Sequence, residues 1–171
     1  MSAPVNPPLT RPLRWAMAVL VLALAACASD PPRTAEPLSG TDAAPNPVRN
    51  DIALYALSLL DTAYRWGGRG PATGFDCSGL VSHVYREAAG LNVGGNSVTL
   101  AQMSRPIDPE KKQPGDLVFF NTLGSPRSHV GVYIGNGRFI HASNPRTGVR
   151  VDLLSNRYYA QRFEGVNTLL D

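Results

Sequence analysis

Apolar and polar residues alternate along the second half of the chain with the two-residue period of β-strands. Five segments show this alternation, or a short apolar run between turn-forming residues, and they span 117–120, 130–134, 138–142, 149–153 and 163–168. Side chains on a strand point alternately to its two faces, so each segment can bury at least one face. The pattern predicts a sheet of about five strands.

Helical spacing dominates the part of the chain that precedes these strands. Apolar residues recur three and four positions apart in two stretches, which are Ile52, Tyr55, Ala56, Leu59, Leu60 and Ala63, and then Leu80, Val81, Val84, Tyr85, Ala88 and Ala89. Asn50 can cap the first helix, and the segment from the second helix to Gly115 is expected to be mostly loop. Helices followed by strands indicate an α+β domain.

The segment 135–137 (Gly-Asn-Gly) separates two predicted strands and is a strong hairpin signal. A two-residue turn would place Val132 opposite His141 and send His129 to the other face. A three-residue loop would place Gly131 opposite His141, and the two histidines would then share a face as diagonal neighbours. The last glycine of the segment suits the left-handed position that ends such a loop. Pairing of the histidines therefore requires the three-residue loop.

Cys77 is one of only two cysteines, and a loop rich in Gly and Pro delivers it to the start of the second predicted helix. A thiol there meets the positive end of the helix dipole and unpaired backbone N–H groups, which predicts a lowered pKa and a nucleophilic thiolate. A single cysteine with distant histidines is the outline of a Cys–His hydrolase. For the cysteine taken alone, the alternative is a small buried side chain that packs as a hydrophobe.

Five motifs follow one another in an order typical of one family. They are Tyr-Arg-Trp-Gly-Gly at 64–68, Phe-Asp-Cys-Ser-Gly-Leu-Val at 75–81, Pro-Gly-Asp-Leu-Val-Phe-Phe at 114–120, Ser-His-Val-Gly-Val-Tyr-Ile-Gly at 128–135 and Phe-Ile-His-Ala-Ser at 139–143. Together they resemble the NlpC/P60 cysteine peptidases of bacterial cell walls. The resemblance implies a papain-like α+β fold, with N-terminal helices packed on an antiparallel sheet of about five strands.

The same resemblance implies a function and a site. The expected activity is hydrolysis of amide bonds in peptidoglycan stem peptides or their crosslinks, without a cofactor. The implied roles are Cys77 as nucleophile, His129 as general base, His141 as the residue that orients His129, Tyr64 as a group that polarises the substrate carbonyl, and Asp76 and Ser78 as groups that help to hold the peptide. One departure from the family pattern lies at 91–99, where relatives often carry Leu-Pro-Arg followed by Ser or Thr. This departure leaves the shape of one cleft wall open.

The N-terminus predicts export and lipid attachment. Arg11 and Arg14 precede an apolar run over 15–26, which suits a signal peptide and is shorter than the roughly 20 residues of a spanning helix. The run ends in Leu-Ala-Ala-Cys at 24–27, which resembles a bacterial lipobox and implies a lipid thioether on Cys27. The alternative is an ordinary cleavage site beside an incidental cysteine.

These features divide the chain into three parts. We expect a lipoprotein signal peptide at 1–26, a lipidated Cys27 with a disordered Pro-rich tether to residue 47, and a catalytic domain at 48–171. Lipidation implies a membrane partner, since two acyl chains give stable anchoring. Residue 28, directly after the lipidated cysteine, is alanine and not aspartate. By family analogy, the absence of an aspartate at this position favours the periplasmic face of the outer membrane.

The charge is modest and does not indicate nucleic-acid binding. Sixteen Lys and Arg against 13 Asp and Glu give a net charge of +3, and the basic residues form no cluster. The sequence lacks C-x-x-C and H-E-x-x-H spacing, so no metal site is expected. Two other functions stay open, which are a non-enzymatic peptidoglycan-binding envelope lipoprotein, and an acyltransferase or amidase that works on lipid amides.

Overall fold

A helix opens the part of the chain that the computed structural model describes, residues 46–171. This helix, α2 (Pro47–Ser58), begins at a proline, and the Asn46 side chain accepts a hydrogen bond from the Val48 amide at 3.1 Å. The prediction that Asn50 caps the helix was wrong, because Pro47 at the first helical position fixes the start four residues earlier than predicted, with Asn46 as the cap. The helix ends before Asp61, whose φ of 63° is left-handed.

The second helix, α3 (Cys77–Ala89), begins at Cys77 as predicted. Asp76 caps its N-terminus, and Gly90 ends it in a left-handed conformation with φ of 66°. Every residue from 78 to 85 is buried, so α3 is the central helix of the domain rather than a surface helix with one apolar stripe.

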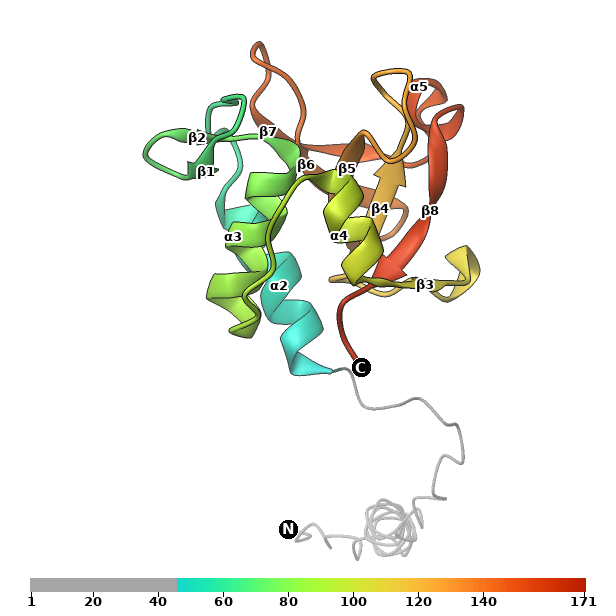
Figure 1. Cartoon of the computed structure of the whole chain (residues 1–171). Helices are drawn as coiled ribbons and strands as arrows, with labels where there is room; N and C mark the ends of the chain where they lie inside the picture. The colour runs from blue at the N-terminus through green and yellow to red at the C-terminus, as the bar shows by residue number, and fades with distance from the viewer. Residues whose placement is uncertain (1–45) are drawn as a thin grey trace, which may run out of the picture. The chain divides into compact units, whose positions relative to one another are not determined.

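A six-stranded antiparallel sheet follows, in the order β3-β8-β4-β5-β6-β7. The strands are β3 (Arg105–Ile107), β4 (Leu117–Phe120), β5 (His129–Gly135), β6 (Arg138–Ala142), β7 (Val149–Leu153) and β8 (Phe163–Thr168). All five predicted strands are present, and the predicted α+β architecture is confirmed (Figure 1). Only β5 differs in its bounds, since it extends one residue further at each end.

The segment that was expected to be loop contains regular structure. It holds α4 (Ser97–Met103), the edge strand β3 and the 3₁₀ helix η1 (Pro109–Lys111). Strand β3 is not predicted from the sequence because it contains Pro106, and proline in a sheet is confined to edge strands and bulges. Further short elements are β1 (Arg69–Gly70), β2 (Gly74–Phe75) and α5 (Arg157–Ala160).

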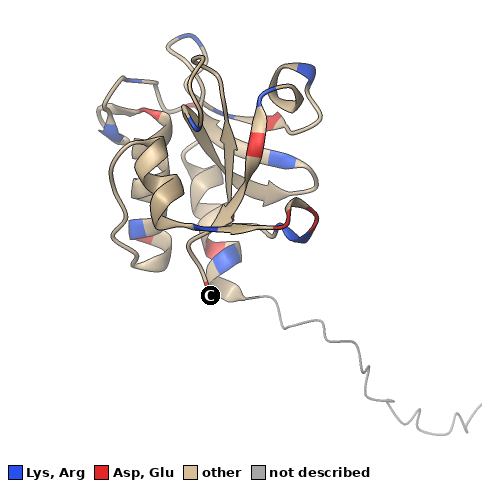
Figure 2. Cartoon of the chain, turned by 45° about the vertical axis from the view of Figure 1, so that its right-hand side comes forward, with Lys and Arg blue, Asp and Glu red and all other residues tan. Residues whose placement is uncertain are grey.

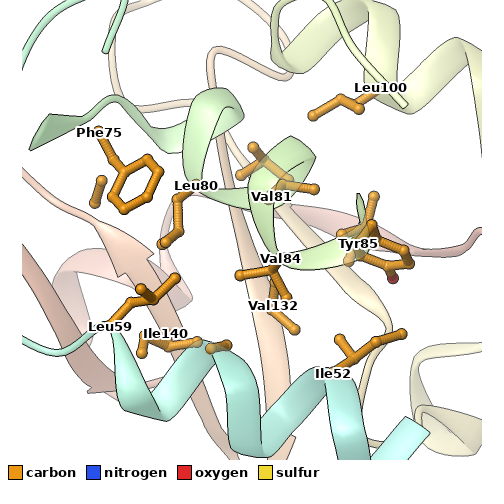
Figure 3. Close-up of a cluster of buried hydrophobic side chains, with 14 of the residues drawn as sticks. Ile52, Leu59, Phe75, Leu80, Val81, Val84, Tyr85, Leu100, Val132 and Ile140 are labelled. Carbon is orange, nitrogen blue, oxygen red and sulfur yellow. The ribbon is translucent and has the colours of Figure 1, made fainter. Parts of the chain in front are cut away.

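The main hydrophobic core lies between the helices and the sheet. Figure 3 shows side chains of α2 and α3, Ile52 and Val84 among them, meeting Val132 and Ile140 of the central strands. A smaller cluster uses strand residues of the opposite parity, Val118, Phe120, Tyr133, Phe139 and Val166, together with Tyr159 of the helical turn at 157–160. Helices α2 and α3 lie side by side in Figure 1 and pack against each other as well as on the sheet.

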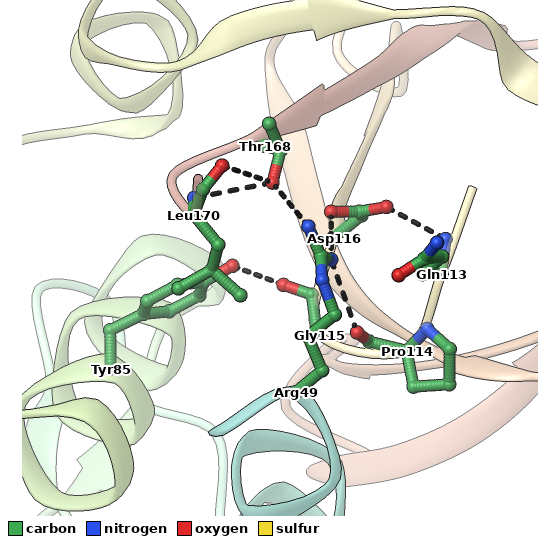
Figure 4. Close-up of polar contacts among 8 residues, drawn as sticks. All are labelled: Arg49, Tyr85, Gln113, Pro114, Gly115, Asp116, Thr168 and Leu170. Carbon is green, nitrogen blue, oxygen red and sulfur yellow. Dashed lines mark hydrogen bonds and ion pairs between the residues drawn. The ribbon is translucent and has the colours of Figure 1, made fainter. Parts of the chain in front are cut away.

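A polar cluster fastens the start of α2 to the start of β4 and to the end of β8 (Figure 4). Arg49 pairs with Asp116 at 2.7 Å and donates to Thr168 Oγ1 at 3.3 Å, and Asp116 also accepts from the Gln113 amide at 2.7 Å. The Tyr85 hydroxyl of α3 donates to the Gly115 carbonyl. Both helices are therefore tied to the same corner of the sheet.

Several predictions concern residues outside this part of the chain. The signal peptide, the lipidated Cys27 and nearly all of the tether lie outside residues 46–171 and stay predictions, as does the domain boundary at 48. Within 46–171, no helix has the length and apolar character needed to cross a membrane. In the view of Figure 2, Lys and Arg are scattered over several elements with Asp and Glu among them.

Replacement of Asp116 by alanine should destabilise the fold by about 3 kcal/mol, because it leaves the Arg49 guanidinium partly buried without its carboxylate. The side chains of Arg49 and Asp116 are 13% and 1% exposed. Glu87→Ala is the matched control, since it breaks the exposed Arg86–Glu87 pair and should cost less than about 1 kcal/mol. Urea unfolding of both variants measures the difference, and equal losses would contradict an anchoring role for Asp116.

Candidate active site

Asp76 holds Cys77 at the N-terminus of α3. Its Oδ1 accepts from the Gly79 amide at 2.6 Å and from the Ser78 hydroxyl at 2.9 Å, and its Oδ2 accepts from the Gly67 amide at 2.9 Å. One carboxylate thus caps the helix and fixes the loop that precedes it. The amides of Cys77 and Ser78, in the unpaired first turn, lie beside the thiol.

Glycines let two backbone segments meet next to the thiol. A Cβ on Gly79 would collide with the Gly68 carbonyl oxygen, and the Asp76 amide donates to that same oxygen at 3.0 Å. The loop at 66–68 therefore lies directly against the first turn of α3. This close approach explains why glycines stand both before and after the cysteine in these motifs.

The β5–β6 hairpin has the register that the histidine pairing requires. Val132 is opposite Ile140 and Tyr133 is opposite Phe139, so Gly131 falls opposite His141. The predicted three-residue loop was wrong, because Gly135 pairs with Arg138 around a two-residue turn and the register shifts between Tyr133 and Gly135. A one-residue bulge thus gives a tight turn the register of a longer loop.

The two histidines meet on one face of this hairpin. His129 Nε2 lies 2.7 Å from His141 Nδ1, and His141 Nε2 lies 2.9 Å from Oδ2 of Asp152. His141 is fully buried and His129 is 7% exposed. A Cβ on Gly131 would lie 2.7 Å from Phe139 Cδ2 and 3.2 Å from His141 Cβ. Glycine at 131 therefore leaves the space that His141 occupies.

A cleft of about 160 Å³ brings together most of the predicted side chains. Its lining residues are Tyr64, Trp66, Asp76, Cys77, Ser78, Asn96, Ser97, Thr122, Leu123, Ser128, His129 and Ser143. Five of the six predicted site residues are in this set. The sixth, His141, lies behind His129, which is where a residue that orients the ring would have to be. Asn96 and Ser97 show that the divergent 91–99 segment supplies part of one wall.

The prediction of a lowered thiol pKa was wrong. Burial raises the pKa of Cys77 to about 11, the backbone amides of Val130 and Ser78 offset this in part, and the Asp76 carboxylate adds to the rise. Burial, with a contribution from His141, lowers the pKa of His129 to about 3. Desolvation disfavours both charged forms and here exceeds the effect of the helix dipole. The resting pair is therefore a neutral thiol and a neutral imidazole.

Tyr64 presents a protonated hydroxyl to the same cleft. Burial and the nearby Cys77 and Asp76 raise the pKa of Tyr64, so its phenol is a hydrogen-bond donor at neutral pH. An isolated bridge between Tyr64 and Phe75 places its backbone beside the residues that lead into Cys77. The tyrosine and the thiol are thus positioned by the same local structure.

Asp152 is a site residue that the sequence analysis missed. It lies on β7, where Asp152 pairs with Phe139 and Arg150 pairs with His141. Alternation along β6 and β7 puts Asp152 diagonally across from His141 on the same face. The alternation of residues across the β6–β7 hairpin is the sequence signal that points to it. Within residues 46–171, no group of three or more His, Cys, Asp or Glu side chains is arranged to hold a metal ion.

The fold and the site together define a class, an α+β domain with a cysteine at a helix start facing a histidine on an antiparallel sheet. The chain belongs to the NlpC/P60 family, whose model matches residues 61–168. It is 40% identical over 119 residues to the murein DD-endopeptidase MepH of Escherichia coli K12. The match covers 67% of this chain and 43% of that protein. The chain thus spans less than half the length of this relative.

Solved structures share the fold. The NlpC/p60 domain of the peptidoglycan hydrolase SagA is 30% identical with a TM-score of 0.62, and the match covers 71% of this chain and 98% of that domain. RipD of Mycobacterium tuberculosis is 21% identical with a TM-score of 0.60 over 72% of this chain and 98% of its own. RipD is described as a non-catalytic NlpC/p60 domain protein adapted to peptidoglycan binding, and at this identity it shows the fold alone.

Stability should fall as the pH drops below about 6.5, the usual pKa of histidine. The fold lowers the pKa of His83, His129 and His141, each mainly through burial. Between the folded and unfolded values the unfolded chain binds more protons. The free energy of unfolding therefore decreases by up to about 1.4 kcal/mol per pH unit for each histidine.

Urea unfolding at pH 7.5, 6 and 5 measures this slope. Between pH 6 and 5, the free energy of unfolding of His129→Gln should depend less steeply on pH than that of the wild type, by about 1 kcal/mol per pH unit. This difference in slope is independent of the effect of the substitution on stability at pH 7.5. An equal slope in the variant and the wild type would contradict a buried, neutral His129.

Proposed function

We propose that this domain hydrolyses amide bonds in peptidoglycan stem peptides or their crosslinks, through an acyl-enzyme on Cys77. The observation that carries the proposal is the single cleft that holds the Cys77 thiol, the His129 imidazole and the Tyr64 hydroxyl. The relatives named as a murein endopeptidase and a peptidoglycan hydrolase support this substrate class.

Acylation begins from the neutral pair. His129 removes the thiol proton as the sulfur attacks the carbonyl carbon, because Cys77 holds its proton until the substrate is in place. Protonated His129 then gives the proton to the nitrogen of the breaking C–N bond, and the amine leaves. A thioester remains on Cys77. Water, deprotonated by His129, attacks the thioester and releases the carboxylic acid and the thiol.

The oxyanion of each tetrahedral intermediate needs donors that are already in position. The amides of Cys77 and Ser78 at the start of α3 supply two, and the Tyr64 hydroxyl supplies a third. These donors are fixed by the Asp76 cap and by the bridge of Tyr64 to Phe75. The intermediate would therefore form without rearrangement of the backbone.

Asp76 and Ser78 are proposed to help hold the peptide, Asp76 by direct contact and Ser78 through its bond to Asp76. Asp76 already accepts three hydrogen bonds within the protein, and a carboxylate has about four acceptor positions. It can therefore accept one further bond from a substrate N–H or ammonium group without giving up the cap. Ser78 is 5% exposed and donates to Asp76, so its contribution is mainly to hold that carboxylate.

Cys77→Ser should abolish hydrolysis and leave the fold intact, because the hydroxyl is nearly isosteric but far less nucleophilic. His129→Ala should lower kcat/KM by at least about 10²-fold, since it removes the general base and acid together. Mass spectrometry of purified muropeptides after digestion measures both and identifies the bond that is cut. Cys27→Ala is the matched control, since it removes the only other cysteine and should retain activity.

Three outcomes would contradict this proposal. Activity of Cys77→Ser above a few per cent of wild type would remove Cys77 from the nucleophile role. Binding of the wild-type protein to peptidoglycan without any cleavage would establish the non-enzymatic function instead. Cleavage of acylated amines but not of muropeptides would assign the domain to lipid amides.

We further propose that the chain is a lipoprotein held at the periplasmic face of the outer membrane through Cys27. The support is the Leu-Ala-Ala-Cys sequence at 24–27, directly after a short apolar run. The proline-rich residues to 47 would then act as a tether, and about 20 extended residues reach roughly 60 Å. A domain on such a tether could search the wall beside the membrane.

Cys27→Ala should move the protein from the membrane fraction to the soluble fraction, because the acyl chains supply the membrane affinity. Detergent-phase partitioning of cells that express each form measures this. The Cys77→Ser protein serves as the control and should stay in the detergent phase. A Cys27→Ala protein that remained there would contradict anchoring through this thiol.

A further inference from the structure

A continuous chain of hydrogen bonds leads from the cleft to Asp152. It runs from His129 Nε2 to His141 Nδ1 at 2.7 Å, and from His141 Nε2 to Asp152 Oδ2 at 2.9 Å. The other carboxylate oxygen, Oδ1, accepts from Arg150 at 2.9 Å. Asp152 is 10% exposed and Arg150 is 45% exposed, so the series of hydrogen bonds connects the buried base, His129, to the protein surface at Arg150.

The carboxylate determines which nitrogen of His141 carries the proton. Burial alone would raise the pKa of Asp152, but the bonds with His141 and Arg150 lower it below its usual value, so Asp152 is an acceptor only. His141 Nε2 must therefore be the protonated nitrogen. The Tyr159 hydroxyl also lies 3.4 Å from Nε2 and could donate to it if Nε2 carried no proton. That arrangement is unfavourable, because the lone pair of Nε2 would then face a carboxylate oxygen at 2.9 Å.

The proton on His141 determines the proton on His129 in turn. Burial keeps both rings neutral, and a neutral imidazole carries a single N–H. With its proton on Nε2, His141 presents a bare Nδ1, which can only accept from His129 Nε2. His129 then has its proton on Nε2 and a bare Nδ1, the one nitrogen that can take the proton from Cys77.

We propose that Asp152 is a positioning residue that sets the tautomers of both histidines and so keeps Nδ1 of His129 free to act as the base. The link to catalysis rests on the proposed function, whereas the tautomers themselves do not. The consequence is directional: reversing the hydrogen-bond polarity at Asp152 should reverse the tautomer of a ring that Asp152 does not touch.

Asp152→Asn should produce this reversal. Arg150 is a donor, so it holds the carboxamide oxygen on its side and turns the NH₂ group toward His141. A donor there requires a bare Nε2 on His141, hence a protonated Nδ1, hence a bare Nε2 and a protonated Nδ1 on His129. The base would then face the thiol with its proton already in place.

Long-range ¹H–¹⁵N NMR of the full chain, labelled at histidine, tests the tautomers without any substrate. The chain has three histidines, and His83 is an internal reference because Arg86 donates to its Nδ1 at 2.9 Å and Tyr55 lies 3.1 Å from its Nε2. All three rings should carry the proton on Nε2 in the wild type. In Asp152→Asn, His129 and His141 should both change to Nδ1, and His83 should not.

Kinetics separate positioning from a merely structural role. Asp152→Asn should lower kcat by at least about 10²-fold with little change in KM, and Asp152→Ala, which imposes no tautomer, should be faster than Asp152→Asn. A structural role predicts the opposite order, because asparagine preserves the shape of the side chain and alanine does not. The double variant Arg150→Ala/Asp152→Asn lets the carboxamide rotate and should recover at least about tenfold of the loss.

The results that overturn the proposal are distinct from those that overturn the proposed function. A wild-type His129 protonated on Nδ1, unchanged tautomers in Asp152→Asn, or a double variant as slow as Asp152→Asn would each overturn the role of Asp152. Switching of the tautomers in a protein that cleaves no muropeptide would support the tautomer assignment and overturn the proposed function.

Discussion

The pairing register of β5 with β6 is the constraint on which the candidate site depends. Since side chains alternate between the faces of a strand, a slip of one residue would turn His129 away from His141. The bulge beside Ile134 reconciles a tight turn with the register that brings the rings to 2.7 Å. Gly131 provides the space for His141. The geometry of a turn at the far end of the hairpin thus decides the contact between the histidines.

Burial gives the site a resting state without charge separation. The helix start and the amides beside the sulfur favour a thiolate, but loss of water outweighs them and raises the pKa of Cys77, while it lowers the pKa of His129. A buried polar group is stable only when it is hydrogen-bonded. The chain His129–His141–Asp152 meets this condition, and every buried side-chain polar atom in residues 46–171 has a partner.

The sequence pattern predicted the elements that carry the chemistry and missed those that shape their surroundings. Five strands and the start of α3 at Cys77 followed from periodicity, because these segments bury long regular faces. The edge strand β3 was missed because it is three residues long and contains Pro106. The pKa of Cys77 was mispredicted because it depends on burial by residues distant in the sequence. Asp152 was missed because its contact with His141 depends on the register of the β6–β7 hairpin.

The nucleophile and the base belong to two different layers of the fold. Cys77 lies on the helical layer, whereas His129, His141 and Asp152 lie on the sheet and orient one another. The distance between thiol and imidazole is therefore set by packing of α3 on β5 and by the anchors that tie the helices to the sheet, Arg49–Asp116 and Tyr85–Gly115. A misplacement of about 1 Å far from the reacting atoms can cost about 10²-fold in rate. The core between the layers thus acts as part of the site, because it holds the two halves of the Cys–His pair in register.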